Sequence, residues 1–366
     1  MRIVVDLQCL QTSSRYRGIG HYVSSLLAAL VEVNRERTEP HELILLLNAC
    51  YPERLQEQYR RWAPVLGADA IRVFHALAET AEPWCPNPGI IRTSEVLYQD
   101  FLERLQPDFV LVGSLFEGMT DDFVCRIPGR RRYAVGVIGY DLIPLISPDQ
   151  YLGDPVIRDW YHRKLRSLRR VDRIFAISES ARREFEGQLA TPEGMVHTIS
   201  TACDDSYYPL PDAENRYAQV LTGLGVDGPF ILASGPPDER KNLNALLQAF
   251  SRLDAGLRQR LRLVFVGRFG AASRAAITRF ARRQGIPETH LIFTGFIPQE
   301  TLNILYNLCS VFVFPSRHEG FGLPVLEAMT CGAPVLCANT TSLPEVMGWE
   351  EAMFDPDDIP RLTALI

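Results

Sequence analysis

Two glutamates flank a glycine-rich turn in the last quarter of the sequence. The segment at 315–335 reads PSRHEGFGLPVLEAMTCGAPV and places Glu319 before the turn and Glu327 after it, in a stretch with the apolar pattern of a short helix. Gly320 and Gly322 let the backbone approach a ligand closely. The free N–H groups and the positive dipole end of the helix then form a site that suits a phosphate.

The two carboxylates would repel a phosphate held at that helix, so a different role fits them better. Carboxylate oxygens accept hydrogen bonds, and the hydroxyls of a sugar are suitable donors. Glu319 and Glu327 are therefore candidates for holding a sugar on either side of the turn. For each glutamate alone, an acidic charge near a helix N-terminus or on a solvated helix face is the alternative explanation.

A pair of cations follows a predicted strand earlier in the chain. The strand segment ILASG leads into PPDERKN, which puts Arg240 and Lys241 where a helix is predicted to begin. Two cations at this position can neutralise a diphosphate leaving group. The alternative is an ordinary solvated helix start, although cations oppose the helix dipole at this end.

These segments resemble a known family. The string SRHEGFGLPVLEAMTCGAPV resembles the Glu-x7-Glu signature of the retaining glycosyltransferases of family 4, also called glycosyl transferases group 1. The N-terminal stretch MRIVVDLQCLQTSSRYRGIGHY, together with YDLIPL and SLPEV, is similar to the bacterial O-antigen and polysaccharide mannosyltransferases of that family. The resemblance covers essentially the whole chain. It implies the GT-B fold, an α/β architecture of two Rossmann-like doubly wound domains that face a central cleft.

The resemblance also implies roles for individual residues. Glu319 is expected to contact hydroxyls of the donor sugar and Glu327 to hold the nucleotide ribose. Arg240 and Lys241 are expected to neutralise the diphosphate. Further contacts to the donor are expected from Gly20 in RGIGHY, from Gly320, Phe321, Gly322 and Leu323 in the turn, and from Phe296 and Ile297 in GFIPQ, against the base. The GFIPQ segment can equally be an ordinary loop between a strand and a helix.

The sequence departs from the family pattern at two places. Gly235 and Pro236 replace a further arginine that is common in the family, so contacts to the diphosphate are expected to be fewer or to come from elsewhere. Tyr140 replaces a histidine that many relatives carry before Asp141, which removes the support for a histidine-assisted step. Asp141 can orient or deprotonate the acceptor hydroxyl, or it can cap the turn that follows its strand.

The implied activity is that of a retaining hexosyltransferase that needs neither a metal nor a cofactor. Mannose from GDP-mannose is the first expectation for the donor, with UDP-sugars as an alternative. The expected acceptor is a growing bacterial surface glycan such as O-antigen or capsule, carried on a polyprenyl diphosphate. Two other interpretations stay open: a catalytically silent GT-B module that binds glycan or a partner enzyme, and an epimerase of nucleotide sugars. Because family members usually continue beyond DDIPRLTALI, we expect a truncated chain or one module of a longer polypeptide.

Short apolar runs alternate with segments of helical period, which is the pattern of α/β domains with parallel sheets. Strands are predicted first at 2–7, 43–48, 70–74, 108–112, 133–138 and 173–177, with helices at 20–33, 92–105 and 157–170 among them. A second series predicts strands near 230–234, 261–266, 290–293, 311–314 and 334–337, with helices near 242–254, 272–284, 299–308 and 322–331. The stretch at about 200–228, rich in Pro, Asp and Gly, predicts a linker. We therefore expect an acceptor-binding domain over 1–205 and a donor-binding domain over 206–366.

The composition limits the classes of partner. A net charge of −6 argues against a dedicated nucleic-acid binder, which would carry a basic surplus. No run of 18 apolar residues occurs, so we expect a cytoplasmic chain that is at most peripheral at the inner face of the plasma membrane. The eight cysteines are scattered and form no zinc-ligand spacing, which predicts reduced core residues and no metal site.

Three smaller patterns complete the sequence. Arginines cluster at 130–132 and along RKLRSLRRVDR at 163–173, and they can meet an anionic membrane surface or form a solvated helix face. Ser178 is predicted to cap a helix. The stretch GLGVDG at 223–228 matches G-x-G-x-x-G, but it precedes a predicted strand and is therefore not interpreted as a nucleotide site.

Overall fold

The computed structural model, which describes residues 1–85 and 87–366, contains two separate parallel sheets. They belong to two units of the chain, Met1–Thr201 and Ala202–Ile366. The predicted boundary after 205 lies close to this division. The predicted linker at 200–228 is partly wrong, because helix α8 (Ala213–Gly223) forms within it.

The sheet of the first unit has seven parallel strands in the order β3-β2-β1-β4-β5-β6-β7. Parallel strands buried on both faces are expected to read as continuous apolar runs, and ELILLLN in β2 does so. The short strand β7 was not predicted. The strands are β1 (Arg2–Asp6), β2 (Glu42–Asn48), β3 (Ile71–Phe74), β4 (Phe109–Val112), β5 (Ala134–Gly139), β6 (Arg173–Ala176) and β7 (Val196–Thr198).

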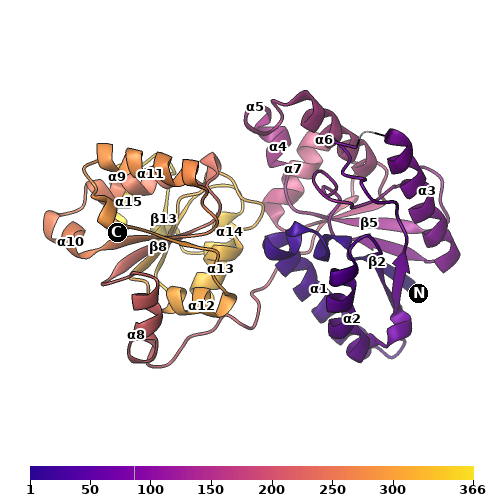
Figure 1. Ribbon diagram of the computed structural model, residues 1–366, viewed down its shortest axis with the longest axis horizontal. Helices are drawn as coiled ribbons and strands as arrows, with labels where there is room; N and C mark the ends of the chain where they lie inside the picture. Colours follow the sequence, from indigo (N-terminus) through magenta and orange to yellow (C-terminus); the bar gives the residue numbers. More distant parts are fainter. Residues whose placement is uncertain (86) are drawn as a thin grey trace. The chain divides into compact units, whose positions relative to one another are not determined.

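Helices cover both faces of this sheet, with α1 and α2 on one face and α3 and α6 on the other (Figure 1). Ser178 caps α7 as predicted, since its Oγ accepts a hydrogen bond of 2.9 Å from the Ala181 N–H. The helices are α1 (Gly18–Arg35), α2 (Pro52–Leu66), α3 (Pro88–Leu105), α4 (Ile143–Ile146), α5 (Pro148–Tyr151), α6 (Pro155–Leu168) and α7 (Glu179–Leu189).

The sheet of the second unit has six parallel strands in the order β10-β9-β8-β11-β12-β13. Helices α9, α11 and α15 cover one face, and α8, α12 and α13 the other (Figure 1). The strands are β8 (Phe230–Ser234), β9 (Arg262–Val266), β10 (Leu291–Gly295), β11 (Val311–Phe314), β12 (Val335–Ala338) and β13 (Met353–Phe354). The remaining helices are α9 (Leu243–Ser251), α10 (Ala255–Arg260), α11 (Ala271–Arg283), α12 (Gln299–Leu308), α13 (Leu323–Thr330), α14 (Leu343–Met347) and α15 (Ile359–Leu365).

The direction in which strands are added reverses once in each sheet. The reversal lies between β1 and β4 in the first unit and between β8 and β11 in the second. In open parallel sheets, ligands bind outside the carboxyl ends of the strands at such a switch point. The loops that follow β8 and β11 are therefore the first place to look for a site in the second unit, and the loops after β1 and β4 in the first.

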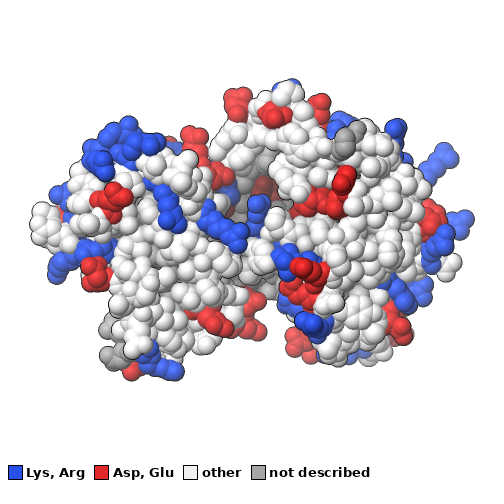
Figure 2. Space-filling view, in the orientation of Figure 1, with Lys and Arg blue, Asp and Glu red and all other residues white. Residues whose placement is uncertain are grey.

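The surface charges, the apolar content of the helices and the cysteines can be compared with what the composition predicted. On the face drawn in Figure 2, basic and acidic side chains are both spread over each unit. No helix within 1–85 and 87–366 is long and apolar enough to cross a membrane. All eight cysteines are free thiols, five of them buried; Cys50, Cys85 and Cys203 are only half-buried, so the prediction of core positions was wrong for these three.

Candidate active site

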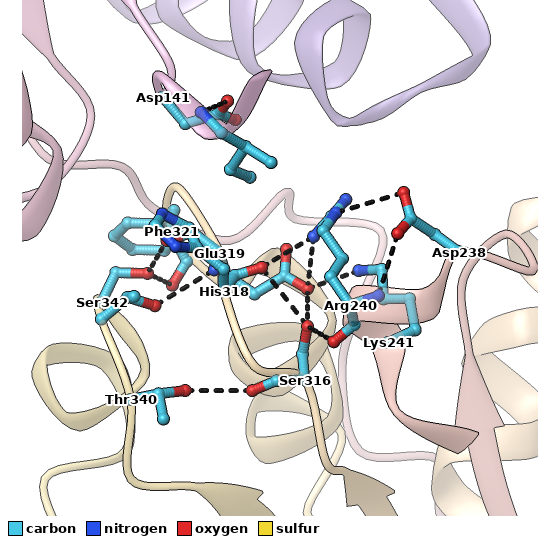
Figure 3. Close-up of polar contacts among 12 residues, drawn as sticks. Asp141, Asp238, Arg240, Lys241, Ser316, His318, Glu319, Phe321, Thr340 and Ser342 are labelled. Atoms are coloured by element: carbon cyan, nitrogen blue, oxygen red, sulfur yellow. Dashed lines mark hydrogen bonds and ion pairs between the residues drawn. The ribbon is translucent and has the colours of Figure 1, made fainter. Parts of the chain in front are cut away.

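The loops after β8 and β11 are joined by their backbones at the switch point of the second sheet. The Arg317 N–H donates a hydrogen bond of 2.7 Å to the Arg240 carbonyl oxygen, and Ser316 Oγ lies 3.2 Å from the same oxygen. This places the predicted cation pair beside the predicted glutamate (Figure 3). Two segments that are far apart in sequence thus form one site.

Glu319 receives two cations on a single carboxylate oxygen. Its Oε1 lies 2.6 Å from Lys241 Nζ and 2.9 Å from Arg240 Nη1, and the Ser316 hydroxyl donates to it at 2.5 Å. Burial alone would raise the pKa of Glu319, but the Lys241 ammonium and the Arg240 guanidinium outweigh it and hold that pKa below its ordinary value. The carboxylate is therefore charged at neutral pH. Its Oε2 takes part in none of these three contacts.

Lys241 is enclosed by groups that suit a buried ammonium. The residue is 6% exposed, and its Nζ lies 4.6 Å from the centroid of the Phe314 ring, at the end of β11. Burial lowers the pKa of Lys241, while the ion pair with Glu319 opposes that shift. Gly235 leaves room for the lysine stem, because a Cβ there would lie 3.0 Å from Lys241 Cε.

Arg240 is held at both ends of its guanidinium. Its Nε lies 3.4 Å from Asp238 Oδ2, and its Nη1 donates a hydrogen bond of 2.8 Å to the His318 carbonyl oxygen. Asp238 also accepts from the Arg240 N–H at 3.0 Å and so fixes the backbone on which both cations are carried. The sequence predicted the position of the two cations but not that they bind Glu319.

The turn between Glu319 and α13 is held by hydroxyls from the loop after β12. The Ser342 hydroxyl shares its one proton between the carbonyl oxygens of Glu319 and Phe321, which lie 2.9 and 2.7 Å from its Oγ, and Thr341 Oγ1 accepts from the Glu319 N–H at 3.1 Å. Gly322 has a φ of 112° and begins the helix; a Cβ there would lie 2.6 Å from Leu343 Cδ2. This glycine is therefore required by the local fold. Sequence analysis missed Thr341 and Ser342, although SLPEV was among the motifs.

The other residues of the predicted turn lie where the sequence placed them. Gly320 is the first residue after Glu319, Phe321 is buried, and Leu323 is the first residue of α13. Glu327 lies within the same helix and is half-buried. Its Oε2 accepts a hydrogen bond of 3.1 Å from the Tyr306 hydroxyl, and burial raises the pKa of Glu327 to about 7.

Phe296 and Ile297 follow β10, on the far side of β9 from the cation pair. The Phe296 ring is exposed, and the Arg268 guanidinium lies over it at 4.9 Å from the ring centroid. Ile297 instead packs against the apolar core. A hydrogen bond of 3.2 Å from the Gly267 N–H to the Gly295 carbonyl oxygen joins the two loops. Sequence analysis missed Arg268; the signal was its position just after a predicted strand.

Gly20 packs against its own loop. It lies in the first turn of α1, and a Cβ there would lie 2.3 Å from Arg15 Cα in the segment Ser13–Tyr16. This close packing alone requires a glycine at that position. The contact of Gly20 with a donor therefore stays a prediction.

The loops after β1 and β4 are joined by a carboxylate that sequence analysis missed. Glu117 Oε2 accepts from Thr12 Oγ1 and Ser14 Oγ, at 3.1 and 2.9 Å, and Oε1 accepts from Ser114 Oγ at 2.9 Å. Burial raises the pKa of Glu117, and the hydroxyls oppose that shift. No motif marked this glutamate, because its three partners come from two separate loops.

Asp141 takes the capping role that was one of its two alternatives. Its Oδ1 accepts a hydrogen bond of 3.1 Å from the Ile143 N–H, at the start of α4. Neighbouring Tyr140 donates its hydroxyl to the Gly113 carbonyl oxygen at 2.8 Å, which ties the end of β5 to the loop after β4. A role for Asp141 with an acceptor hydroxyl stays a prediction.

Within the described part of the chain, no three His, Cys, Asp or Glu side chains are grouped to hold a metal ion.

Comparisons with known proteins show which family the second unit is similar to and which solved structures share the fold. Residues 222–366 match the family described as "Glycosyl transferases group 1". The chain is 37% identical over 361 residues to the serotype-specific mannosyltransferase WbdA of Escherichia coli, covering 98% of this chain and 42% of that protein. It is 36% identical over 193 residues to the O-antigen chain mannosyltransferase B of E. coli, covering 53% of this chain and 50% of that protein. The chain thus spans less than half of the length of WbdA.

Solved structures share the fold with low sequence identity. Sucrose-phosphate synthase from Thermosynechococcus elongatus superimposes with a TM-score of 0.70 at 18% identity, over 100% of this chain and 88% of that one. HepE of Anabaena, solved in complex with UDP, gives 0.65 at 16% identity, with the same coverage. The predicted GT-B class, with two Rossmann-like doubly wound domains, is confirmed.

Proposed function

Because residues 222–366 match the family described as "Glycosyl transferases group 1", we propose that the chain is a retaining mannosyltransferase acting on a bacterial surface glycan. The donor is GDP-mannose and the acceptor is a hydroxyl of a growing chain such as O-antigen or capsule. No metal and no cofactor take part. The reaction takes place on the cytoplasmic side of the plasma membrane, where the acceptor is carried on a polyprenyl diphosphate.

One observation carries this proposal: Arg240 and Lys241 converge on Glu319 at the switch point of the family domain. A buried and a half-buried cation beside the first turn of a helix are suited to a ligand with negative charge. The carboxylate that orders them adds a hydrogen-bond acceptor for hydroxyls. A sugar joined to a diphosphate has both kinds of group, next to each other.

The chemistry follows from where charge develops. The bond between the anomeric carbon and the β-phosphate oxygen breaks, and its electron pair stays on that phosphate. The acceptor hydroxyl oxygen forms the new bond on the same face, and its proton passes to the leaving phosphate. Arg240 and Lys241 stabilise the growing charge, and preorganised groups of this kind typically contribute about 3–4 kcal/mol each to lowering the barrier. Glu319 orients both cations and accepts from the sugar.

The choice of GDP-mannose rests on the relatives. WbdA and the O-antigen chain mannosyltransferase B are both mannosyltransferases by name. A third relative, from Mycolicibacterium smegmatis, is named a GDP-mannose-dependent α-(1-6)-phosphatidylinositol monomannoside mannosyltransferase; it is 29% identical over 216 residues, or 55% of this chain and 54% of that protein. Within the site, Arg268 and Phe296 offer a flat exposed surface on which the base can stack, and Glu327 accepts hydrogen bonds from the ribose.

The decisive experiment is a transfer assay with the purified chain. GDP-mannose and a synthetic mannoside carrying an alkyl chain are incubated with the protein in the presence of EDTA, and products are followed by mass spectrometry. We expect GDP and a mannoside extended by one residue, with the α configuration conserved in its NMR spectrum. UDP-glucose in place of GDP-mannose tests the alternative donor.

Other outcomes of the same assay would support the alternative functions. Conversion of the nucleotide sugar without an acceptor identifies an epimerase. Neither transfer nor hydrolysis, despite a thermal shift with GDP or UDP, identifies a silent binding module. Activity that requires an added divalent cation contradicts the metal-independent mechanism.

A further inference from the structure

An open pocket of about 460 Å³ lies at the amino ends of two neighbouring strands in the first unit. It is lined by the segment before β5 and the segment before β6, namely Gly129, Arg130, Arg131, Tyr133, Arg170 and Asp172. We call it the arginine pocket. Its volume falls within the range of about 300–1,000 Å³ that is typical of small-molecule sites. Because the strands are parallel, the pocket lies at the edge of the sheet opposite to Glu117 and Tyr140.

The walls of the pocket are fixed by one arginine and one aspartate. Arg131 Nη1 donates a hydrogen bond of 2.8 Å to the Pro128 carbonyl oxygen, and its Nη2 forms an ion pair with Asp172. Asp172 also accepts from the Val135 N–H at 2.7 Å. Arg131 is thus a structural cation, neutralised by Asp172, that holds the two segments together. Its Nε is buried without a hydrogen-bond partner.

The other two arginines are not neutralised. Arg130 and Arg170 are exposed, and among the described residues neither side chain has an ion-pair or hydrogen-bond partner. An arginine after the end of α6 is favoured by the helix dipole, which gives one reason for Arg170 but none for Arg130. The two residues are far apart in sequence, and both line the same pocket.

The pocket carries a positive charge, although the chain as a whole is acidic. Three arginines and one aspartate give the pocket a surplus of two positive charges, whereas the chain as a whole carries −6. Like charges brought together in one depression repel each other unless an anion lies between them. Guanidinium groups match phosphate oxygens with paired hydrogen bonds, better than they match a monovalent ion such as chloride.

We propose that the arginine pocket is a binding site for a phosphate group, separate from the residues proposed to bind the nucleotide sugar. Its ligand is a phosphomonoester, a diphosphate or a phospholipid headgroup, with Arg130 and Arg170 as the residues that bind it and Arg131 and Asp172 as the residues that position them. The proposal does not depend on the proposed transferase activity, because it uses a different edge of a different sheet.

The test compares two charge-matched double variants. Arg130→Ala with Arg170→Ala removes both free cations of the pocket. Arg132→Ala with Arg169→Ala removes two exposed arginines from the same two segments, and neither of these lines the pocket. Both variants lose the same charge, and neither removes a contact that holds the fold. Inorganic pyrophosphate is titrated into the original chain and both variants by isothermal titration calorimetry.

Binding at the nucleotide-sugar site contributes equally to all three titrations, because its residues are unchanged. We expect the pocket variant to lose affinity about tenfold for each charge-assisted hydrogen bond removed. The control variant should stay within about twofold of the original chain. A second arm measures flotation with mixed vesicles of phosphatidylcholine and phosphatidylglycerol, and with pure phosphatidylcholine vesicles as the neutral reference.

The two arms distinguish the source of the phosphate. Loss of pyrophosphate binding in the pocket variant alone supports a soluble ligand, and loss of vesicle binding in the pocket variant alone supports a lipid headgroup. Equal losses in the pocket and control variants would show a general effect of charge and overturn the proposal. Absence of a difference between the three proteins in both arms would overturn it as well.

Discussion

Lys241 and Glu319 form an ion pair of 2.6 Å in which both residues are more than nine-tenths buried, in the segments that follow the neighbouring strands β8 and β11. A buried pair of this kind is hard to break, because removal of one partner leaves an uncompensated charge. In the proposed mechanism the same lysine stabilises the leaving phosphate. Stability and catalysis can therefore be separated by variants of this pair.

Lys241→Met should lower the rate of mannose transfer by about 10²- to 10³-fold, because a preorganised cation is lost from the leaving group. It should also lower the free energy of unfolding by about 3 kcal/mol, since Glu319 is left buried with only Arg240 as its cation. The double variant Lys241→Met with Glu319→Gln should regain most of that stability without regaining activity. Denaturant unfolding and the transfer assay measure the two effects, and full activity of the single variant would contradict the proposed role.

Gly235→Ala should disturb the site through Lys241. Its φ of 120° disfavours a side chain, and the new Cβ would lie 3.0 Å from Lys241 Cε. Gly225→Ala is the matched control, because Gly225 also has a positive φ, 77°, but no atom lies within 4 Å of its added Cβ. Both variants should lose about 1–3 kcal/mol of stability from backbone strain. Only Gly235→Ala should also reduce activity, and equal activity in the two variants would show that the close approach is unimportant.

The raised pKa of Glu327 should make the free energy of unfolding depend on pH. Burial raises its pKa in the folded protein from 4.5 to about 7, so the folded state binds the proton more tightly than the unfolded state. The resulting stabilisation is complete below about pH 4.5 and is lost as the pH rises through about 7. Because each unit of pKa shift corresponds to about 1.4 kcal/mol, this stabilisation amounts to a few kcal/mol. Glu327→Gln should abolish this part of the pH dependence when unfolding free energies are compared across that range.

The same titration should govern nucleotide binding if Glu327 holds the ribose. An ionised carboxylate accepts both ribose hydroxyls, so the affinity for GDP should increase as the pH rises through about 7. In Glu327→Gln the affinity should be lower and should not change over this range. An identical pH profile in both proteins, measured by calorimetry, would exclude Glu327 from the ribose site.

Arg268→Ala tests the stacking surface for the base. Arg283 provides a matched control, because its guanidinium also lies over an aromatic ring, that of Phe280, at 5.6 Å in helix α11. Loss of Arg268 should raise the dissociation constant for GDP by about three- to tenfold, the equivalent of one cation–π contact. Arg283→Ala should leave it unchanged. Equal effects of the two variants on GDP binding would place the base elsewhere.

The sequence predicted the central strands of both sheets and the edge strands β3 and β10, but it missed β7 and β13 at the opposite edges. Strand β8 was predicted at its observed bounds, because FILAS is a continuous apolar run buried on both faces. The edge strands β7 and β13 have three and two residues, too few for a pattern to be recognised. Helix α8 was missed because its sequence lies between segments rich in Pro, Asp and Gly, and propensity alone decides little there.

The site was predicted as residues but not as contacts. Arg240, Lys241 and Glu319 were singled out by their types and positions, yet the ion pairs that join them span nearly 80 positions of sequence. Glu117 and Arg268 were missed for the same reason, since Thr12 and Ser14, which bind Glu117, and Phe296, which lies under Arg268, come from other loops. Periodicity describes neighbours along a chain, whereas the topology of the sheet decides which loops meet.

The hydroxyls of Thr341 and Ser342 form hydrogen bonds with the backbone of Glu319 and Phe321, so the fold itself orders this turn. A segment that is already shaped for its partner loses little conformational freedom when the partner arrives. The entropy of ordering this turn is therefore lost once, when the polypeptide folds, and not again at each encounter with a substrate.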